Sequence, residues 1–298
     1  MPMPGTWLLC WPLLALTAVS WAPCTARAAP AESASANCPA PASAARAPAG
    51  PRYLLASAAD ILVLLPPPPA ADSAAQQDDL RAVLQAQRDA RSAGTVAHAL
   101  ADVQADCGRF ADVIGEALTS PSDAQVLAFL NRAALEAATV VGPAKTYWHR
   151  LRPYAYSPEV EALGDMAPAS KAPDIDTQER SNCPSMPAGP EAAAALAHSS
   201  YPSGHATFGT VCAILLAQMV PEKRAQLFAR SLDYGHSRLV MGAHFPSDVL
   251  AGRIAGTVAA QLLMQNPQFQ HDFSEGRSSL RQLLGLAQSG SQPPAAGR

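Results

Sequence analysis

Charged and aromatic side chains are scarce in this 298-residue chain, at 15% and 6% of the residues. Few aromatic and many alanine residues favour helices over β-strands, which are rich in Val, Ile and Tyr. The formal net charge of −3 offers no basic surface to nucleic acid, so we expect no nucleic-acid partner. The length is sufficient for one large domain with a substantial core.

Beyond its first residues, the chain also lacks an apolar run that could cross a bilayer. Residues 206–220 are too few for a transmembrane helix, and Arg253 interrupts a later run. Residues 7–22 are mostly apolar and precede the small-residue sequence at 26–28, which is typical of a cleaved secretory signal. We therefore predict a signal peptide over residues 1–28, a periplasmic or secreted protein and no integral membrane segment. A retained membrane anchor is the alternative, although prolines interrupt the apolar run.

The six cysteines lack the Cys-x-x-C and Cys/His spacings of zinc sites. Removal of the signal leaves Cys38, Cys107, Cys183 and Cys212. In an exported protein, four cysteines permit two disulfides in three pairings, and the sequence does not choose among them. Cys212 lies in an apolar helical run, so a buried free thiol is an alternative for this residue.

The composition divides the chain into a body with two polar ends. Residues 29–50 are rich in Ala, Pro and Ser and predict a flexible leader, and residues 286–298 predict a disordered tail. Between them we expect one domain over residues 51–285. Helical periodicity begins near Asp72 or Ser73 and recurs at about 94–106, 109–118, 122–141, 190–198, 204–219, 222–235 and 247–264. The sequence therefore predicts an all-α, compact helical bundle, with a long loop at 154–188 that is either functional or mobile.

Positively charged residues suited to phosphate occur in two of three polar stretches of the body. Lys145 and Arg152 lie seven positions apart, and Arg238 follows much later in the chain. Arginine offers phosphate a planar pair of donors and lysine a point charge. For Lys145 and Arg152, the alternative is an ordinary solvated basic surface, because Arg150 and a histidine lie between them.

The sequence Pro202-Ser203-Gly204-His205 leads directly into the apolar run and so stands at the start of a helix. Free N–H groups and the helix dipole favour an anion there. Gly204 lets the backbone approach a ligand closely, and Ser203 can cap the helix or donate its hydroxyl. The alternative is an ordinary serine-capped helix with His205 on the surface.

His244 and Asp248 flank a second helix start. Pro246 suits the first helical position, which puts His244 just before the helix and Asp248 in its first turn. A carboxylate within reach of an imidazole fixes its tautomer, leaves one nitrogen free to attack, and stabilises the positive charge that follows. The alternative is an aspartate that only complements the helix dipole, beside a structural histidine.

The order and spacing of these stretches are more specific than any one of them. Lys-x6-Arg-Pro, Pro-Ser-Gly-His and Ser-Arg-x5-His-x3-Asp follow one another, separated by 48 residues (154–201) and 31 residues (206–236). This pattern resembles the signature of the type 2 phosphatidic acid phosphatase and vanadium haloperoxidase superfamily. Within it, the segments Leu64–Ala70, Asp72-Ser73 and Ser200-Tyr201 resemble class A bacterial non-specific acid phosphatases, and the resemblance covers roughly residues 52 to 280.

The resemblance implies a role for each residue of the pattern. His244 would be the nucleophile that forms a phosphohistidine, Asp248 would orient it, and His205 would act as general acid and then as general base. The phosphoryl oxygens would be held by Lys145, Arg152, Ser203, the Gly204 amide and Arg238. Neither a metal nor another cofactor is required, because the cations do the work of Mg²⁺.

The resemblance also implies an activity, that of an acid phosphatase hydrolysing small phosphomonoesters to inorganic phosphate. The alternatives are a vanadate-dependent haloperoxidase and a lipid or diphosphate phosphatase of the same superfamily. The sequence leaves open the preferred ester, any phosphotransferase activity, the assembly into a homo-oligomer and the role of residues 154–201.

Overall fold

The computed structural model describes residues 53–54, 59–90, 92–121, 124–164 and 190–286. All of these belong to one compact unit that extends from Ala45 to Arg298. They form helices and, over these ranges, no strand, so the predicted all-α fold is confirmed. The predicted signal peptide (1–28), the leader (29–50) and residues 287–298 of the predicted tail lie outside the described residues.

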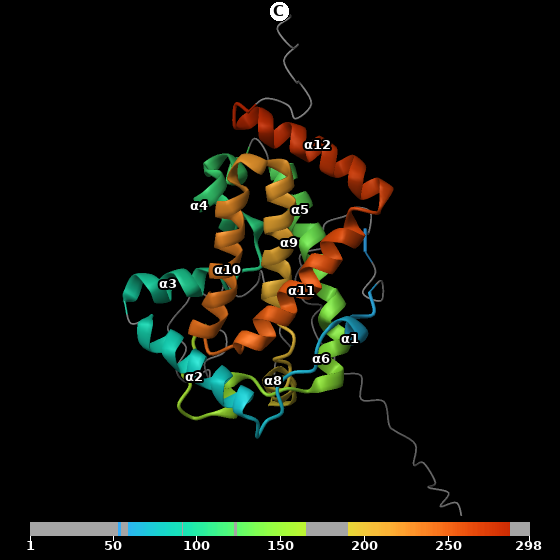
Figure 1. Ribbon diagram of the computed structural model, residues 1–298. Coiled ribbons are helices and arrows are strands. Elements are labelled where there is room, and N and C mark those ends of the chain that lie inside the picture. The colour runs from blue at the N-terminus through green and yellow to red at the C-terminus, as the bar shows by residue number, and fades with distance from the viewer. Residues whose placement is uncertain (1–52, 55–58, 91, 122–123, 165–189, 287–298) are drawn as a thin grey trace, which may run out of the picture. The chain divides into compact units, whose positions relative to one another are not determined.

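The helices follow one another in the order shown by the colours of Figure 1. The α-helices are α1 (Ile61–Leu64), α2 (Ala74–Asp89), α3 (Ala93–Ala101), α4 (Ala111–Ile114), α5 (Ala124–Ala138), α6 (Gly142–Trp148), α7 (Pro153–Tyr156), α8 (Pro190–Ala197), α9 (Gly204–Met219), α10 (Arg224–Val240), α11 (Pro246–Leu263) and α12 (Pro267–Leu283). The short 3₁₀ helices are η1 (Cys107–Phe110), η2 (Glu116–Thr119), η4 (Thr139–Val141) and η7 (Pro221–Lys223).

Helix α9 is the central helix of the bundle. It packs against α5, α10 and α11, and Figure 1 shows it between them. Its sequence is apolar on every side, and nearly all its side chains are buried. A helix without a polar face is stable only when neighbours cover it all round, which explains its place.

Glycines bring α11 so close to α9 that the starts of the two helices meet. A Cβ atom on Gly252 would lie 2.3 Å from the carbonyl oxygen of Ser203, and one on Gly256 would lie 2.6 Å from that of Thr207. Beside this contact, the Ser203 N–H donates to the Asp248 carbonyl oxygen at 3.0 Å. The glycines therefore set the register in which two predicted site residues become neighbours.

Several helix starts are where the sequence predicts them. Ser73 caps α2 by accepting from the Gln76 N–H, and Ser203 caps α9 in the same way. Pro246 is the first residue of α11. These capping predictions are confirmed because they rest on local backbone chemistry rather than on tertiary packing.

Other predicted boundaries are wrong, each for a local reason. The helix predicted at 109–118 is broken into η1, α4 and η2, because Gly115 adopts a left-handed backbone conformation with φ of 106°. Helix α3 ends at Ala101, short of residue 106, and α10 continues to Val240, past residue 235. Helix α12 was not predicted, because its apolar face is narrow: Phe269, Phe273 and Leu280 are its large buried apolar side chains.

A disulfide joins η1 to α9. Cys107 and Cys212 are bonded with their Cα atoms 5.5 Å apart and 105 residues of separation in the chain. The alternative of a buried free thiol at Cys212 is therefore wrong, while Cys38 and Cys183 lie outside the described residues. In the chain-entropy account, closing a loop of this size contributes about 4–5 kcal/mol to stability.

One helical stretch of the described residues is long and apolar enough to cross a bilayer. It runs from Ala124 to Tyr156, with a mean hydropathy of 1.2, and 44% of its most apolar window is buried inside the protein. Core helices of soluble proteins pass the same test, so this stretch is weak support for a membrane span.

Candidate active site

The three polar stretches converge at the end of the bundle where α9 and α11 begin. Arg152, just before α7, brings its Nη1 to 3.3 Å from the His244 Nε2. Lys145, on α6, donates through Nζ to the Ser199 carbonyl oxygen at 2.6 Å, and the Arg152 Nη2 reaches the Ser199 hydroxyl at 3.2 Å. Residues separated by about a hundred positions in the sequence thus share one site.

Arg238 occupies the same site from the C-terminal end of α10. It is almost completely buried, and its carbonyl oxygen accepts from the N–H groups of Ala243 and His244 at 3.0 and 3.3 Å. Its positive charge helps to lower the pKa values of both His205 and His244. The turn after α10 therefore holds Arg238 and His244 together.

His244 is buried, and its surroundings define its tautomer. Its Nδ1 lies 3.6 Å from an oxygen of Asp248, while its Nε2 faces Arg152. A guanidinium group can only donate, so Nε2 must carry the lone pair and Nδ1 the proton. Burial, followed by the charges of Arg152 and Lys145, lowers the pKa of His244 well below its usual 6.5. The ring is neutral at pH 7 and presents a free nitrogen toward the cations.

Asp248 lies in the first turn of α11, as predicted, and both of its oxygens are engaged. Oδ2 accepts from the Phe245 N–H at 2.8 Å and from the Ser200 hydroxyl at 2.6 Å. Oδ1 pairs with the Arg150 Nη1 at 2.5 Å. The carboxylate is therefore held rigidly beside His244.

Arg150 is the site residue that the sequence analysis missed. From the sequence it is named only as part of the alternative, a solvated basic surface, but it is buried and its guanidinium pairs with Asp79 as well as Asp248. Its guanidinium carbon also stacks 4.4 Å from the centre of the Phe245 ring. A signal was available in α2, where Gln76, Asp79 and two apolar residues recur at helical spacing on the buried face.

His205, in the first turn of α9, is the second imidazole of the site. Its Nε2 lies 2.8 Å from the Val103 carbonyl oxygen, which can only accept, so Nε2 carries a proton and Nδ1 remains for proton exchange. Burial, then the charge of Arg238, lowers its pKa well below 6.5, with smaller contributions from Arg152 and Lys145. The ring is thus neutral at pH 7.

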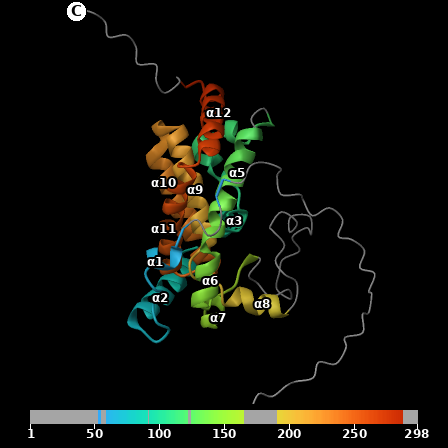
Figure 2. The same ribbon diagram turned by 90° about the vertical axis from the view of Figure 1, so that its right-hand side faces the viewer.

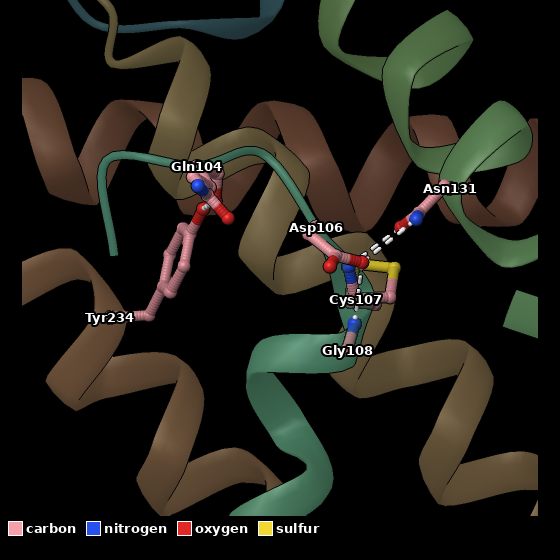
Figure 3. Close-up of a disulfide and its surroundings, with 7 residues drawn as sticks. Gln104, Asp106, Cys107, Gly108, Asn131 and Tyr234 are labelled. Atoms are coloured by element: carbon pink, nitrogen blue, oxygen red, sulfur yellow. Dashed lines mark hydrogen bonds between the residues drawn. A yellow bond between two sulfur atoms is a disulfide. The ribbon is translucent and has the colours of Figure 1, made fainter. Parts of the chain in front are cut away.

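The loop that carries Val103 is fixed by several contacts, which Figure 3 displays. The Tyr234 hydroxyl donates to the Gln104 carbonyl oxygen at 2.8 Å, and the Asn131 amide donates to Asp106 at 2.8 Å. The disulfide at Cys107 ties the same loop to α9. The carbonyl that orients His205 therefore has little freedom to move.

Lys145 is a weaker base than an ordinary lysine. Burial, then the neighbouring charge of Arg152, lowers its pKa to about 7, although Asp248 acts in the opposite direction. The ammonium charge is complete under acidic conditions and is lost as the pH rises through about 7. A site that depends on this cation for anion binding should favour acidic pH.

Ser203 and Gly204 form the start of α9, the helix whose first turn carries His205. The Ser203 hydroxyl accepts from the Ala206 N–H at 3.2 Å and still has its own hydrogen to donate. A Cβ on Gly204 would contact only the side chain of Val141, at 4.0 Å. Protein packing therefore does not demand glycine there, and a closely approaching ligand remains the reason for it.

The electrostatics of the site suit a tetrahedral oxyanion. Lys145, Arg152 and Arg238 surround two neutral imidazoles at a helix N-terminus. Two clusters of potential metal ligands occur among the described residues, and neither contains a predicted site residue: they are His98, Asp102 and Asp233, and His271, Asp272 and Glu275. In the first of these, the oxygens of Asp102 already accept from Arg230 and Ser237.

Comparison with known proteins places this geometry in a family. A non-specific acid phosphatase of Salmonella typhimurium is 42% identical over 81 residues, which cover 27% of this chain and 32% of that protein. One of Providencia stuartii is 36% identical over 84 residues, 28% of this chain and 34% of that protein. A lipid A 1-phosphatase of Rhizobium etli is 38% identical over 60 residues, 20% of this chain and 26% of that protein.

These matches span only about a third of the length of the acid phosphatases. The family comparison is broader, because the pattern of the PAP2 superfamily matches residues 125–272, which include every predicted site residue from Lys145 to Asp248. Residues 125–272, about half of the chain, thus form a PAP2 superfamily domain, and the all-helical fold and the convergence of those residues agree with this match.

Proposed function

We propose that the protein is an acid phosphatase that hydrolyses phosphate monoesters through a phosphohistidine at His244. The observation that carries the proposal is the His244 Nε2 lone pair, which faces Arg152 in a buried site with two further cations. The similarity to proteins named non-specific acid phosphatase supports the same reaction class.

Substrate binding uses the cations and the helix start. Lys145, Arg152 and Arg238 neutralise the phosphoryl oxygens, and the Ser203 hydroxyl with the Gly204 N–H donates to them. A hydrogen bond to a charged group contributes about 1.5–3 kcal/mol, so these donors together can lower the barrier substantially. The chain's own cations supply the charge that Mg²⁺ supplies in other phosphoryl-transfer enzymes, and the proposal includes no metal.

In the first step, the His244 Nε2 forms a bond to phosphorus as the bond to the ester oxygen breaks. The His205 Nδ1 gives its proton to the leaving oxygen, so the alcohol departs neutral. Asp248 stabilises the positive charge that develops on the His244 ring.

In the second step, water attacks phosphorus and the bond to Nε2 breaks. Neutral His205 accepts a proton from the water, and inorganic phosphate leaves. His205 must therefore be charged in the first step and neutral in the second. The negative charge of a bound substrate would favour the charged form of His205, which burial and the neighbouring cations otherwise disfavour.

The disulfide supports a place for the protein outside the cytoplasm. Disulfides persist in the periplasm and in secreted proteins and are rare in a reducing cytosol. Together with the apolar residues 7–22, the Cys107–Cys212 bond fits a periplasmic or secreted enzyme whose signal peptide is removed.

A comparison of leaving groups tests the proposed role of His205. The His205→Ala variant lacks the acid, so its kcat should fall by about 10²–10⁴-fold on an alkyl phosphate, whose leaving oxygen needs a proton. On a nitrophenyl phosphate, whose leaving group departs without one, the loss should be much smaller. Equal losses on both substrates, or full activity of the variant, would contradict the assignment.

A lipid phosphatase is the second candidate, because a lipid A 1-phosphatase is among the similar proteins. The same site could hydrolyse either substrate, so the choice between a soluble ester and a lipid depends on which of them can reach the site. Assays with a soluble phosphomonoester and with a phosphorylated lipid in detergent would separate the two functions. Turnover of the lipid alone would replace the acid phosphatase proposal by the second candidate.

A further inference from the structure

A buried chain of charges extends from the candidate site to α2. The guanidinium group of Arg150 lies between two carboxylates: its Nη1 contacts Asp248 at 2.5 Å, and its Nη2 contacts Asp79 at 2.8 Å. The Gln76 side-chain oxygen accepts from the same Nη2 at 2.6 Å. All of these residues are largely buried, so the interactions are weakly screened by solvent.

The hydroxyl of Ser247 closes this network. It lies 2.6 Å from the Arg150 Nη1 and also contacts Asp79, which in addition accepts from the Ser247 N–H at 3.3 Å. Because Ser247 precedes Asp248 in the first turn of α11, the network fixes the turn that carries the carboxylate. The planar fork of arginine suits this bridge, and a lysine cannot contact both carboxylates in the same way.

We propose that Arg150, itself held by Asp79, is a positioning residue that fixes the Asp248 carboxylate and sets the negative charge that His244 experiences. The proposal rests on the proposed function of His244 as nucleophile. Arg150 contacts Asp248 and acts on His244 only through that carboxylate, so it is a positioning residue and not a catalytic one.

The balance of charges explains why two carboxylates are present. Asp248 and Arg150 alone would sum to zero and would offer little stabilisation to a positively charged His244. With Asp79 the three groups sum to −1, which offsets the single positive charge of the phosphorylated imidazole. Asp79 thus neutralises Arg150, so that the negative charge of Asp248 remains available to stabilise His244.

Substitutions that change this sum should move the titration of His244 in opposite directions. The other charged groups facing His244 are Lys145 and Arg152 on one side, His205 from α9 and Arg238 from α10, and they are unchanged in every variant. Asp79→Asn removes a negative charge and should lower the pKa of His244. Arg150→Met removes a positive charge and should raise it, each by about half to one pH unit.

The double variant separates charge from geometry. Asp79→Asn with Arg150→Met again sums to −1, so the pKa of His244 should return close to the wild-type value. The contact of Arg150 with Asp248 Oδ1 remains lost, so kcat should stay about 10–100-fold low, as when an outer partner of a functional histidine is removed. The affinity for inorganic phosphate should hardly change, because Arg150 makes no contact within the cluster of oxyanion-binding cations.

The experiment is a titration of His244 by NMR in the full-length protein, with the signal assigned by its loss in His244→Ala. Arg281→Met is the matched control, because it breaks the ion pair of another buried arginine, whose partner Glu222 is exposed, at the other end of the bundle. It should lower the melting temperature without moving the titration. If Arg150→Met does not fold, Asp79→Asn, a near-isosteric change, still tests the direction of the shift.

The outcomes distinguish this inference from the proposed function. Opposite shifts in the two single variants and recovery in the double variant support the positioning role, whether or not a given ester is hydrolysed. Unchanged titration in both single variants, or shifts in the same direction, would overturn it. Absence of phosphatase activity in the wild-type protein would overturn the proposed function and leave the titration result standing.

Discussion

The two ends of the bundle differ in the side chains that they bury: mainly charged groups at one end and aromatic rings at the other. At one end, α9 and α11 begin among buried charges: Arg150, Arg152, Arg238 and Asp248. Helix α12 covers the other end, as Figure 2 shows. There the rings of Tyr53, Phe129, Phe269 and Phe273 pack together, and the centre of the Phe269 ring lies 5.3 Å from the ring centres of both Tyr53 and Phe129.

The difference separates function from stability. Buried charges cost desolvation energy and contribute little net stability even when paired, so the gathering of several of them around the starts of α9 and α11 indicates another use. Aromatic packing contributes burial and ring contacts without chemistry. Substitutions at the charged end should therefore reduce activity more than stability, and those at the aromatic end should do the reverse.

The largest effect is expected from His244→Ala. Loss of the nucleophile should lower kcat by about 10³-fold or more. The cations remain, so inorganic phosphate should still raise the melting temperature of the variant. Kinetics on an aryl phosphate and thermal unfolding with and without phosphate provide the check. A variant with wild-type kcat, or one that no longer binds phosphate, would contradict the separation of binding from attack.

At the aromatic end, Phe269→Ala should destabilise the protein by about 3–5 kcal/mol, because the ring is completely buried. The kcat of the remaining folded protein should stay within about twofold of wild type, since this cluster has no contact with the site residues. Denaturant unfolding measures the first quantity and steady-state kinetics the second. A large drop in kcat with little change in stability would break the comparison.

A smaller effect is expected from Lys145→Arg. Lys145 has a pKa lowered to about 7, so its charge is present below that pH and lost above it. Arginine keeps its charge, and the variant should lose less activity than the wild type between pH 6 and pH 8, roughly one unit to either side of that pKa. Measurements of kcat/KM over this range decide the matter: parallel profiles would mean that Lys145 does not set the alkaline limit.

The smallest effect is expected from removing metal ions. Because the cations of the chain are proposed to neutralise the phosphoryl group, EDTA should leave the activity unchanged within about twofold. Activity that disappears with EDTA and returns with a divalent cation would show that the charged end depends on more than its own residues.

The sequence predicts the charged end better than the aromatic end. The starts of α9 and α11 depend on Ser203 and Pro246, whose effects are local, and the spacing of Lys145, Arg152 and Arg238 is a fixed pattern. Helix α12 shows only a narrow apolar face, so its periodicity is weak. Its burial depends on contact with α5 and α9, which no local pattern encodes.

The role of Arg150 illustrates what local reasoning misses. In the sequence, Arg150 lies between Lys145 and Arg152, and all three could belong to a solvated basic surface. No residue near it in the sequence indicates that it is buried. Its partners Asp79 and Asp248 lie 71 and 98 positions away, and only tertiary packing brings them together. The disulfide is similar, because four cysteines allow several pairings and the fold selects Cys107 with Cys212.

Trapping the covalent intermediate tests the central claim most directly. Wild-type protein turning over a phosphomonoester would be denatured in alkali, in which phosphohistidine survives, and the modified residue located by mass spectrometry. The account predicts one phosphoryl group on the Nε2 nitrogen of His244, absent in His244→Ala. A phosphoryl group on another residue, or hydrolysis with none on His244 at any stage, would contradict it.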